Sequence, residues 1–136
     1  MIDKEIIKIA SNTENHGILD SYTHFSKLKN VICGDEMKVY LIVENNKVMH
    51  FKYECESCIY CQASVSLLSR KAKSKSIEKV KSFAEQAKNY FDKSSKSRDK
   101  EWKEFDMIMT KNNISRKECL LLPVNTMLDA LNKKSL

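Results

Sequence analysis

The fold is decided by residues 37–53, MKVYLIVENNKVMHFKY. In the first half of this stretch every second position is apolar, beginning with Met37, and the turn-forming pair Asn45-Asn46 follows. Residues 48–53 are a second stretch with the β-branched and aromatic residues that favour strands. The pattern predicts a β-hairpin, in which two antiparallel strands are joined by a tight turn at Asn45-Asn46.

Helical spacing begins where the hairpin ends. After Cys58 an apolar residue recurs at intervals of three or four, which predicts a helix, and a second stripe with Ser76 as N-cap predicts another. The first stripe comprises Cys61, Val65, Leu68 and Ala72, and the second comprises Ile77, Val80, Ala84, Ala87 and Phe91.

Weaker signals cover the other segments. Short helices are predicted over residues 3–10 and 102–109. Residues 11–30 are predicted to form a loop with an edge strand at 22–25, and residues 93–100 to form a polar loop.

The last helix is predicted to end at Leu131, but its start is ambiguous. The segment Ser115-x-x-Glu118 has the form of a capping box. Pro123, however, fits only the first turn of an unkinked helix, which favours a start near Leu120.

The order of these elements predicts the fold class. Strands come first and helices follow, which is typical of an α+β domain with helices packed on one face of an antiparallel sheet. We therefore expect one domain over residues 1–136, with a small sheet of about three strands.

Composition narrows the class of protein. The chain has 136 residues, of which 42% are hydrophobic and 31% charged, as in a soluble globular domain, and only 2 glycines and 1 proline interrupt its regular elements. The net charge of +6 comes from lysines interleaved with Glu and Ser, without an aromatic platform, so we expect no nucleic-acid partner. No apolar stretch predicts a membrane span or a signal peptide, and we expect a cytoplasmic protein without a membrane partner.

The 5 cysteines are the unusual feature. In the cytoplasm thiols stay reduced, so an odd number indicates buried thiols, metal ligands or reactive thiols. Gly34 lies between Cys33 and Asp35, where a positive φ or a close approach of another group would aim both side chains at one point. Thiolate and carboxylate are both zinc ligands, and the carboxylate is the ligand more easily displaced from an iron–sulfur cluster.

Cys55, Cys58 and Cys61 form C-x2-C-x2-C, the first part of a ferredoxin-type run. Cys58 falls at the junction of strand and helix, where a helix N-terminus stabilises a thiolate. Cys61 belongs to the apolar stripe and is expected to be a buried hydrophobe, whereas the role of Cys55 stays open.

Cys119 lies at or just before the last predicted helix. Cys33, Cys58 and Cys119 therefore share a position at element boundaries, and together with Asp35 they would complete a four-coordinate site. The 3 histidines, His16, His24 and His50, lack ligand-like spacing.

These residues resemble the U-type iron–sulfur scaffold family, which comprises IscU, the N-terminal domain of NifU, and SufU. Residues 30–35, NVICGD, are similar to the family pattern N-P-x-C-G-D, and residues 57–66, SCIYCQASVS, are similar to G-C-x-x-x-x-A-S-x-S. Arg116, Cys119 and the Leu-rich helix resemble the third cysteine element. The long interval between Cys58 and Cys119, and Glu118 in place of the IscU histidine, favour the SufU branch.

The resemblance implies that Cys33, Asp35, Cys58 and Cys119 bind a zinc ion or a nascent iron–sulfur cluster. It further implies that Cys33 and Cys119 flank the metal in the SufU branch, with Cys119 accepting persulfide sulfur from a cysteine desulfurase. Apo iron–sulfur acceptor proteins would be the other partners.

We therefore expect an iron–sulfur cluster assembly protein, a scaffold or sulfur acceptor rather than a conventional enzyme. Two alternatives stay open. One is a zinc-dependent sulfurtransferase partner of a SufS-type desulfurase, and the other is a non-catalytic structural zinc module, whose metal only stabilises the fold.

Overall fold

The computed structural model describes residues 4–91 and 100–133. Its strands are β1 (His24–Lys29), β2 (Glu36–Glu44) and β3 (Lys47–Glu56). Its α-helices are α1 (Lys4–Ala10), α2 (Ile59–Ala72), α3 (Ile77–Ala87) and α4 (Lys117–Asn132), and its 3-10 helices are η1 (Lys100–Met107) and η2 (Lys111–Arg116). Of the predicted polar loop at 93–100, all but Lys100 lies outside the described residues.

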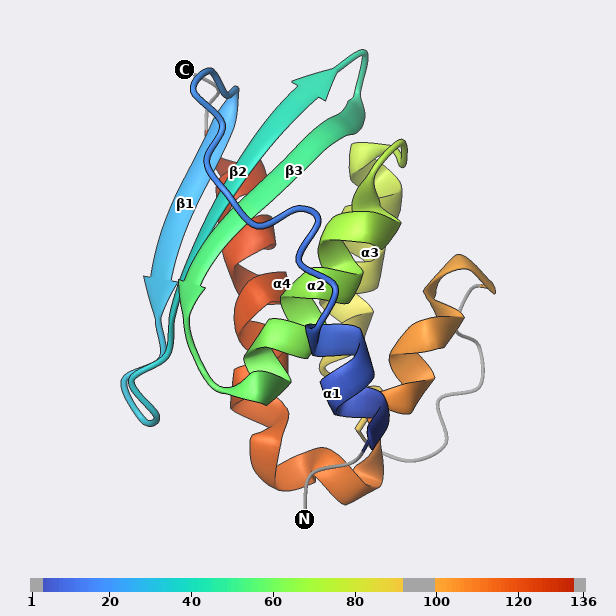
Figure 1. The fold of residues 1–136 in the computed structure, drawn as a ribbon. Coiled ribbons are helices and arrows are strands. Elements are labelled where there is room, and N and C mark those ends of the chain that lie inside the picture. Colours follow the sequence, from blue (N-terminus) through green and yellow to red (C-terminus); the bar gives the residue numbers. More distant parts are fainter. Residues whose placement is uncertain (1–3, 92–99, 134–136) are drawn as a thin grey trace.

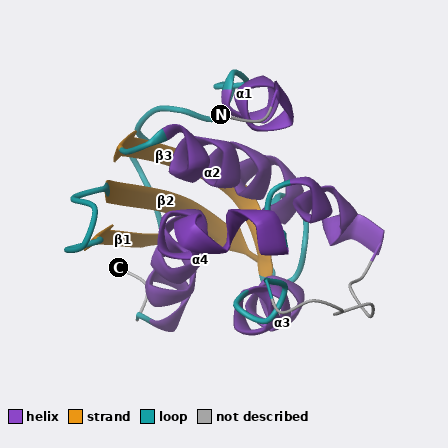
Figure 2. Ribbon diagram, turned by 90° about the horizontal axis from the view of Figure 1, so that it is seen from below, coloured by secondary structure: helices purple, strands orange, loops and turns teal. Residues whose placement is uncertain are grey.

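The strands form an antiparallel sheet in the order β1-β2-β3, and helices cover one of its faces (Figures 1 and 2). Helix α4 packs on β1 and β2, and α2 packs on β3. Helix α1 lies against α2, and α3 against α4. The predicted α+β class is confirmed. Among the described helices, none is long and apolar enough to cross a membrane.

The predicted hairpin is present as β2 and β3. Asn45 (φ 52°) and Asn46 (φ 64°) both occupy the left-handed region that a two-residue hairpin turn requires. The register places apolar residues opposite one another on the face that the helices cover, in the pairs Met37–Cys55, Val39–Tyr53 and Leu41–Phe51. This alternation fixes the register, because a slip of one residue would turn the whole apolar set to solvent.

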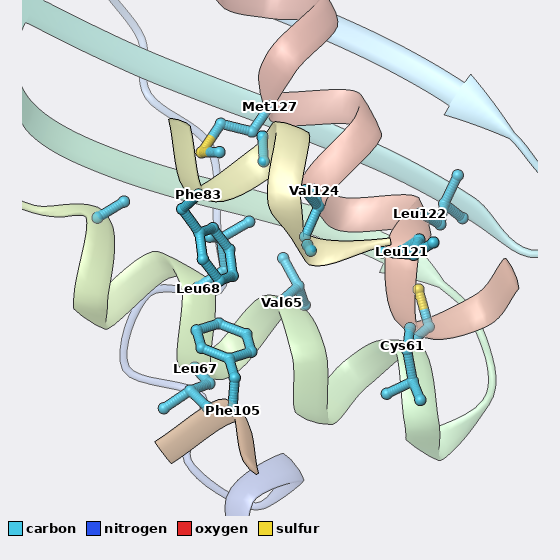
Figure 3. Close-up of a cluster of buried hydrophobic side chains, with 14 of the residues drawn as sticks. Cys61, Val65, Leu67, Leu68, Phe83, Phe105, Leu121, Leu122, Val124 and Met127 are labelled. Carbon is cyan, nitrogen blue, oxygen red and sulfur yellow. The ribbon is translucent and has the colours of Figure 1, made fainter. Parts of the chain in front are cut away.

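The helices meet the sheet through a continuous apolar core. Figure 3 shows side chains of α2, such as Val65 and Leu68, facing Val124 and Met127 of α4. Phe83 of α3 stacks on Trp102 of η1 with ring centroids 4.2 Å apart. Packing of this kind, rather than intrinsic propensity, stabilises most short helices.

The edge strand was predicted at residues 22–25, but β1 runs over His24–Lys29. Most of its residues are polar, and Ser26 is fully buried and hydrogen-bonded to Asp129 of α4. The backbone pairing with β2 and this contact with α4 hold residues that have little strand preference of their own.

The predicted start of the last helix near Leu120 is wrong, because α4 begins at Lys117 and contains Pro123 in its interior. Its N-cap is Arg116, which makes no side-chain capping bond, so Ser115 does not cap it either. Pro123 has no N–H to donate to the carbonyl of Cys119, and the burial of Pro123 with its apolar neighbours outweighs that loss.

Three other predicted helices agree with the structure to different extents. Helix α1 matches the helix predicted over residues 3–10, and Ser76 caps α3 by accepting a bond from the Lys79 amide at 3.2 Å. Helix α3 ends at Ala87, although the apolar stripe continues to Phe91, which is buried beyond the helix end. The helix predicted over 102–109 is the 3-10 helix η1.

The hairpin turn can be tested with Asn45. An alanine has no polar side chain to ease a positive φ, so Asn45→Ala should lower the free energy of unfolding by about 1 kcal/mol. Asn45→Gly keeps the conformation accessible and should cost less than the alanine variant. Urea unfolding measures both variants, and equal midpoints for alanine and glycine would contradict the role given to this turn.

Candidate metal centre

The loop between β1 and β2 presents the first two candidate ligands. Asn30 closes it, since its amide donates to the Asp35 carbonyl at 2.8 Å and its carbonyl accepts from the Gly34 amide at 2.7 Å. Gly34 has φ 78°, and a Cβ built on it would meet nothing within 4 Å. Of the two reasons that the sequence offered for this glycine, the structure supports the positive φ and not a close approach.

The second ligand element lies at the same end of the sheet. Glu36, the first residue of β2, pairs with Glu56, the last residue of β3, so the segments before and after the hairpin leave the sheet together. Cys58 is the N-cap of α2, and its amide donates to Asp35 Oδ1 at 3.2 Å. The positive end of the helix macrodipole favours a carboxylate at this position.

Asp35 has the side chain that most clearly indicates a cation site. The residue is only 6% exposed, and Oδ2 is shielded from solvent and makes no hydrogen bond within the described residues. Leaving a buried carboxylate oxygen without a partner is costly. A metal ion would supply that partner, and carboxylate oxygen is a suitable ligand for it.

Helix α4 brings the third element to this point. Cys119 is its third residue, and the Cys119 Sγ donates to the Cys33 Sγ at 3.7 Å. One ligand atom each from Cys33, Asp35 and Cys119 lies within 4.8 Å of the other two. Within residues 4–91 and 100–133 this is the group that meets the geometric requirement for a metal ion.

Cys58 lies beside this group rather than within it. Its thiol interacts with that of Cys119 as a hydrogen-bond partner and electrostatically. The structure thus brings all four predicted site residues to one place, with three of them tightly grouped. The histidines His16, His24 and His50 do not join the group.

Burial raises the pKa of the Cys119 thiol well above its ordinary value, and the hydrogen bonds and charges of Cys58 and Cys33 raise it further. Without a metal ion, Cys119 is therefore a neutral thiol at pH 7. A cation that binds here must displace its proton.

The two thiols of the close pair differ in exposure. Cys119 is 5% exposed, whereas Cys33 lies on the surface of its loop. Beside Cys33, the apolar side chains of Val31 and Ile32 are 88% and 83% exposed. A second protein can therefore reach Cys33 directly, but not Cys119.

Two further contacts join the helices that carry Cys58 and Cys119. The Ser64 hydroxyl of α2 donates to the Leu120 carbonyl of α4 at 2.6 Å. The Arg116 guanidinium lies 5.1 Å from the centroid of the Tyr60 ring, a distance typical of a cation–π interaction. The sequence analysis did not single out Tyr60, although an aromatic residue two positions after one candidate ligand was visible.

Comparison with known proteins identifies the family. The model of the NifU-like N-terminal domain matches residues 1–101. The iron–sulfur cluster assembly scaffold protein IscU of Thermotoga maritima is 31% identical over 135 residues, which span 99% of this chain and 95% of that relative. The chain belongs to the NifU-like N-terminal domain family, as its cysteine elements predict.

Solved structures agree on the fold. The N-terminal part of a nitrogen-fixing NifU-like protein from Brucella abortus has a TM-score of 0.82 at 20% identity, covering 95% of this chain and 90% of that one. The SufU protein of Fervidobacterium islandicum AW-1 has a TM-score of 0.82 at 24% identity and covers 96% of both chains. Because relatives of several branches match, the SufU branch stays a prediction. The family match ends before Cys119.

Metal binding should release protons. Because the pKa of Cys119 is raised, Zn²⁺ binding requires deprotonation, and the apparent affinity should rise by about tenfold or more for each pH unit between about pH 6 and 8. Calorimetry in buffers of different ionisation enthalpy counts the protons. Cys61→Ala, which changes a thiol outside the candidate site, should release as many as the unchanged chain, and pH-independent binding would refute the candidate site.

The contact between Tyr60 and Arg116 should keep Cys119 covered. Tyr60→Leu removes the ring and should speed alkylation of Cys119 by about fivefold, which corresponds to about 1 kcal/mol. Tyr60→Phe keeps the ring and should behave like the unchanged chain. Mass spectrometry of alkylated peptides measures the rates, and buried Cys61 reports any general unfolding. Equal rates in the two variants would show that the contact does not hold Cys119.

Proposed function

We propose that the chain is an iron–sulfur cluster assembly scaffold, which holds a nascent cluster through Cys33, Asp35, Cys58 and Cys119. The observation that carries this proposal is the grouping of a carboxylate oxygen of buried Asp35 with the Cys33 and Cys119 sulfurs within 4.8 Å of one another, while Asp35 Oδ2 makes no hydrogen bond within the described residues. Membership of the family and the similarity to the T. maritima scaffold protein support it.

The donor set suits a cargo that must be bound and then released. Thiolates are soft ligands that suit iron–sulfur clusters, whereas a carboxylate oxygen is a harder ligand for iron in a cluster. A set of three sulfurs and one oxygen therefore holds the cluster with one ligand that is easier to displace. An acceptor apoprotein would take the cluster by replacing the ligands in turn.

Sulfur would arrive as a persulfide from a cysteine desulfurase. Cys119, the acceptor that the family resemblance implies, is buried, so Cys33 is the thiol that the donor meets first. Cys119 Sγ then attacks the outer sulfur of the Cys33 persulfide across the 3.7 Å that separates the two Sγ atoms. A new bond forms between Cys119 Sγ and that sulfur, and Cys33 leaves as a thiol with the proton that Cys119 gives up.

A zinc-dependent sulfurtransferase that works with a SufS-type desulfurase is the second candidate. The same four residues would hold Zn²⁺, which keeps thiols deprotonated and available to a sulfur donor. The exposure of Cys33 supports this candidate, because it leaves one ligand within reach of a partner. It also argues against a purely structural zinc module, whose site is normally closed.

The sulfur route is tested with a cysteine desulfurase, its substrate cysteine and the purified chain. We expect persulfide on Cys33 and then on Cys119, and Cys33→Ser should reduce the persulfide on Cys119 by about tenfold or more. Peptide mass spectrometry locates the extra sulfur. Cys61→Ala is the matched control and should accept sulfur normally.

Iron added to the same mixture separates the two candidates. A visible cluster chromophore supports the scaffold, whereas bound zinc and faster desulfurase turnover without a chromophore support the sulfurtransferase. A chain that unfolds when zinc is chelated and accepts no sulfur would be a structural zinc module, and the proposal would be wrong.

A further inference from the structure

Cys55 and Cys61 are not used by the proposed scaffold site, yet both lie next to it. Each thiol interacts electrostatically with Cys58 and Asp35. Each also has the hydroxyl of Ser57, whose Oγ is shielded from solvent, as a hydrogen-bond partner. A second group of thiols, gathered around the Ser57 hydroxyl, therefore adjoins the Cys58 ligand.

The two thiols differ in access. Cys61 is fully buried, as its place in the apolar stripe predicts. Cys55 is half-buried and lines two neighbouring pockets, of about 480 and 180 Å³, neither of which is lined by Cys33 or Cys119. Cys55 thus has its own opening to solvent, separate from the surface on which Cys33 is exposed.

The pockets differ in charge. The larger is lined, besides Cys55, by Ala10, Thr13, His16, Tyr53 and Gln62. The smaller has Glu36, Glu54 and Glu56 with a single lysine, Lys38, and would repel anions. The larger pocket has no acidic side chain, and its volume falls within the range of about 300–1,000 Å³ found for small-molecule sites.

We propose that Cys55 is a second sulfur-accepting thiol, which takes sulfur from a small alkyl persulfide through the larger pocket and passes it to Cys58. This inference rests on the proposed function, because sulfur on Cys58 is useful only where a cluster is assembled. It gives the C-x2-C part of the cysteine run a role beyond metal ligation.

Both steps are exchanges without net oxidation. Cys55 Sγ loses its proton and attacks the outer sulfur of R–S–SH, a Cys55 Sγ–S bond forms, the S–S bond of the donor breaks, and the leaving sulfur takes up that proton and departs as R–SH. The Cys58 thiolate then attacks the outer sulfur of the Cys55 persulfide, and the Cys55 thiolate leaves. The Ser57 hydroxyl, a hydrogen-bond partner of Cys55, can stabilise that leaving thiolate by donating to it.

The test uses the full chain with Cys33 and Cys119 both changed to serine, so that the only cysteines are Cys55, Cys58 and Cys61. Cysteine hydropersulfide is the probe, and fragmentation of alkylated peptides locates the added sulfur over time. We expect persulfide first on Cys55 and then on Cys58. Adding Cys55→Ser should slow arrival at Cys58 by about tenfold, whereas adding Cys61→Ser should not. Equal arrival at Cys58 without Cys55 would overturn the proposal.

A second variant keeps every cysteine. Thr13 is an exposed residue of the larger pocket, and Thr13→Phe should narrow that pocket without disturbing the core. Persulfide formation on Cys55 should then slow by about fivefold or more, while alkylation of Cys33 stays unchanged. If Thr13→Phe has no effect on Cys55, the pocket is not the route and the proposal fails.

Comparing two donors on the unchanged chain separates this proposal from the proposed function. A desulfurase should place sulfur on Cys33, and cysteine hydropersulfide should place it on Cys55. If the desulfurase places no sulfur on Cys33 but cysteine hydropersulfide places sulfur on Cys55, only assembly fed by a desulfurase is refuted. If the desulfurase places sulfur on Cys33 but cysteine hydropersulfide places none on Cys55, only the role of Cys55 as a second acceptor is refuted.

Discussion

The pairing of Glu36 with Glu56 at the open end of the β2–β3 hairpin determines where the site forms. Because the two strands begin and end at this rung, Asp35 and Cys58 leave the sheet side by side and can share a hydrogen bond. Like charges placed opposite each other destabilise a sheet, and Lys27 Nζ lies 3.6 Å from Glu36 to offset this. The buried pairs further along the hairpin, such as Val39 with Tyr53, hold that rung in place, so core and site share one register.

The candidate site is an arrangement of incompletely satisfied groups. One Asp35 oxygen accepts a bond from the amide at the start of α2, the other makes no hydrogen bond within residues 4–91 and 100–133, and the surroundings of the Cys119 thiol keep it protonated. The energetic cost of leaving these groups unsatisfied disappears when a cation binds, because the cation pairs with the Asp35 oxygen and stabilises the thiolates. Metal affinity and the stability of this end of the molecule are therefore linked.

Local signals determined how much could be predicted from the sequence. Features that depend only on neighbouring residues could be predicted from the sequence. They are the Asn45-Asn46 turn, the Ser76 cap and the positive φ of Gly34. The extent of β1 and the interior position of Pro123 depend on packing against other elements, which a pattern of residues does not encode. For the site, position at element boundaries indicated the ligands, but which thiol would be exposed follows from how the loop and α4 pack. The larger pocket beside Cys55 is lined by residues of α1, β3 and α2, so a pattern within a single segment could not predict it.

Val31 and Ile32 give the loop of Cys33 a further property. Two β-branched side chains that are almost entirely exposed to water are unfavourable for an isolated molecule, and they directly precede Cys33, the exposed thiol among the candidate ligands. Any protein that brings sulfur to Cys33 must cover them. Its hold on this chain would then come from apolar contact more than from charge, so the encounter would tolerate changes in ionic strength despite the net charge of +6.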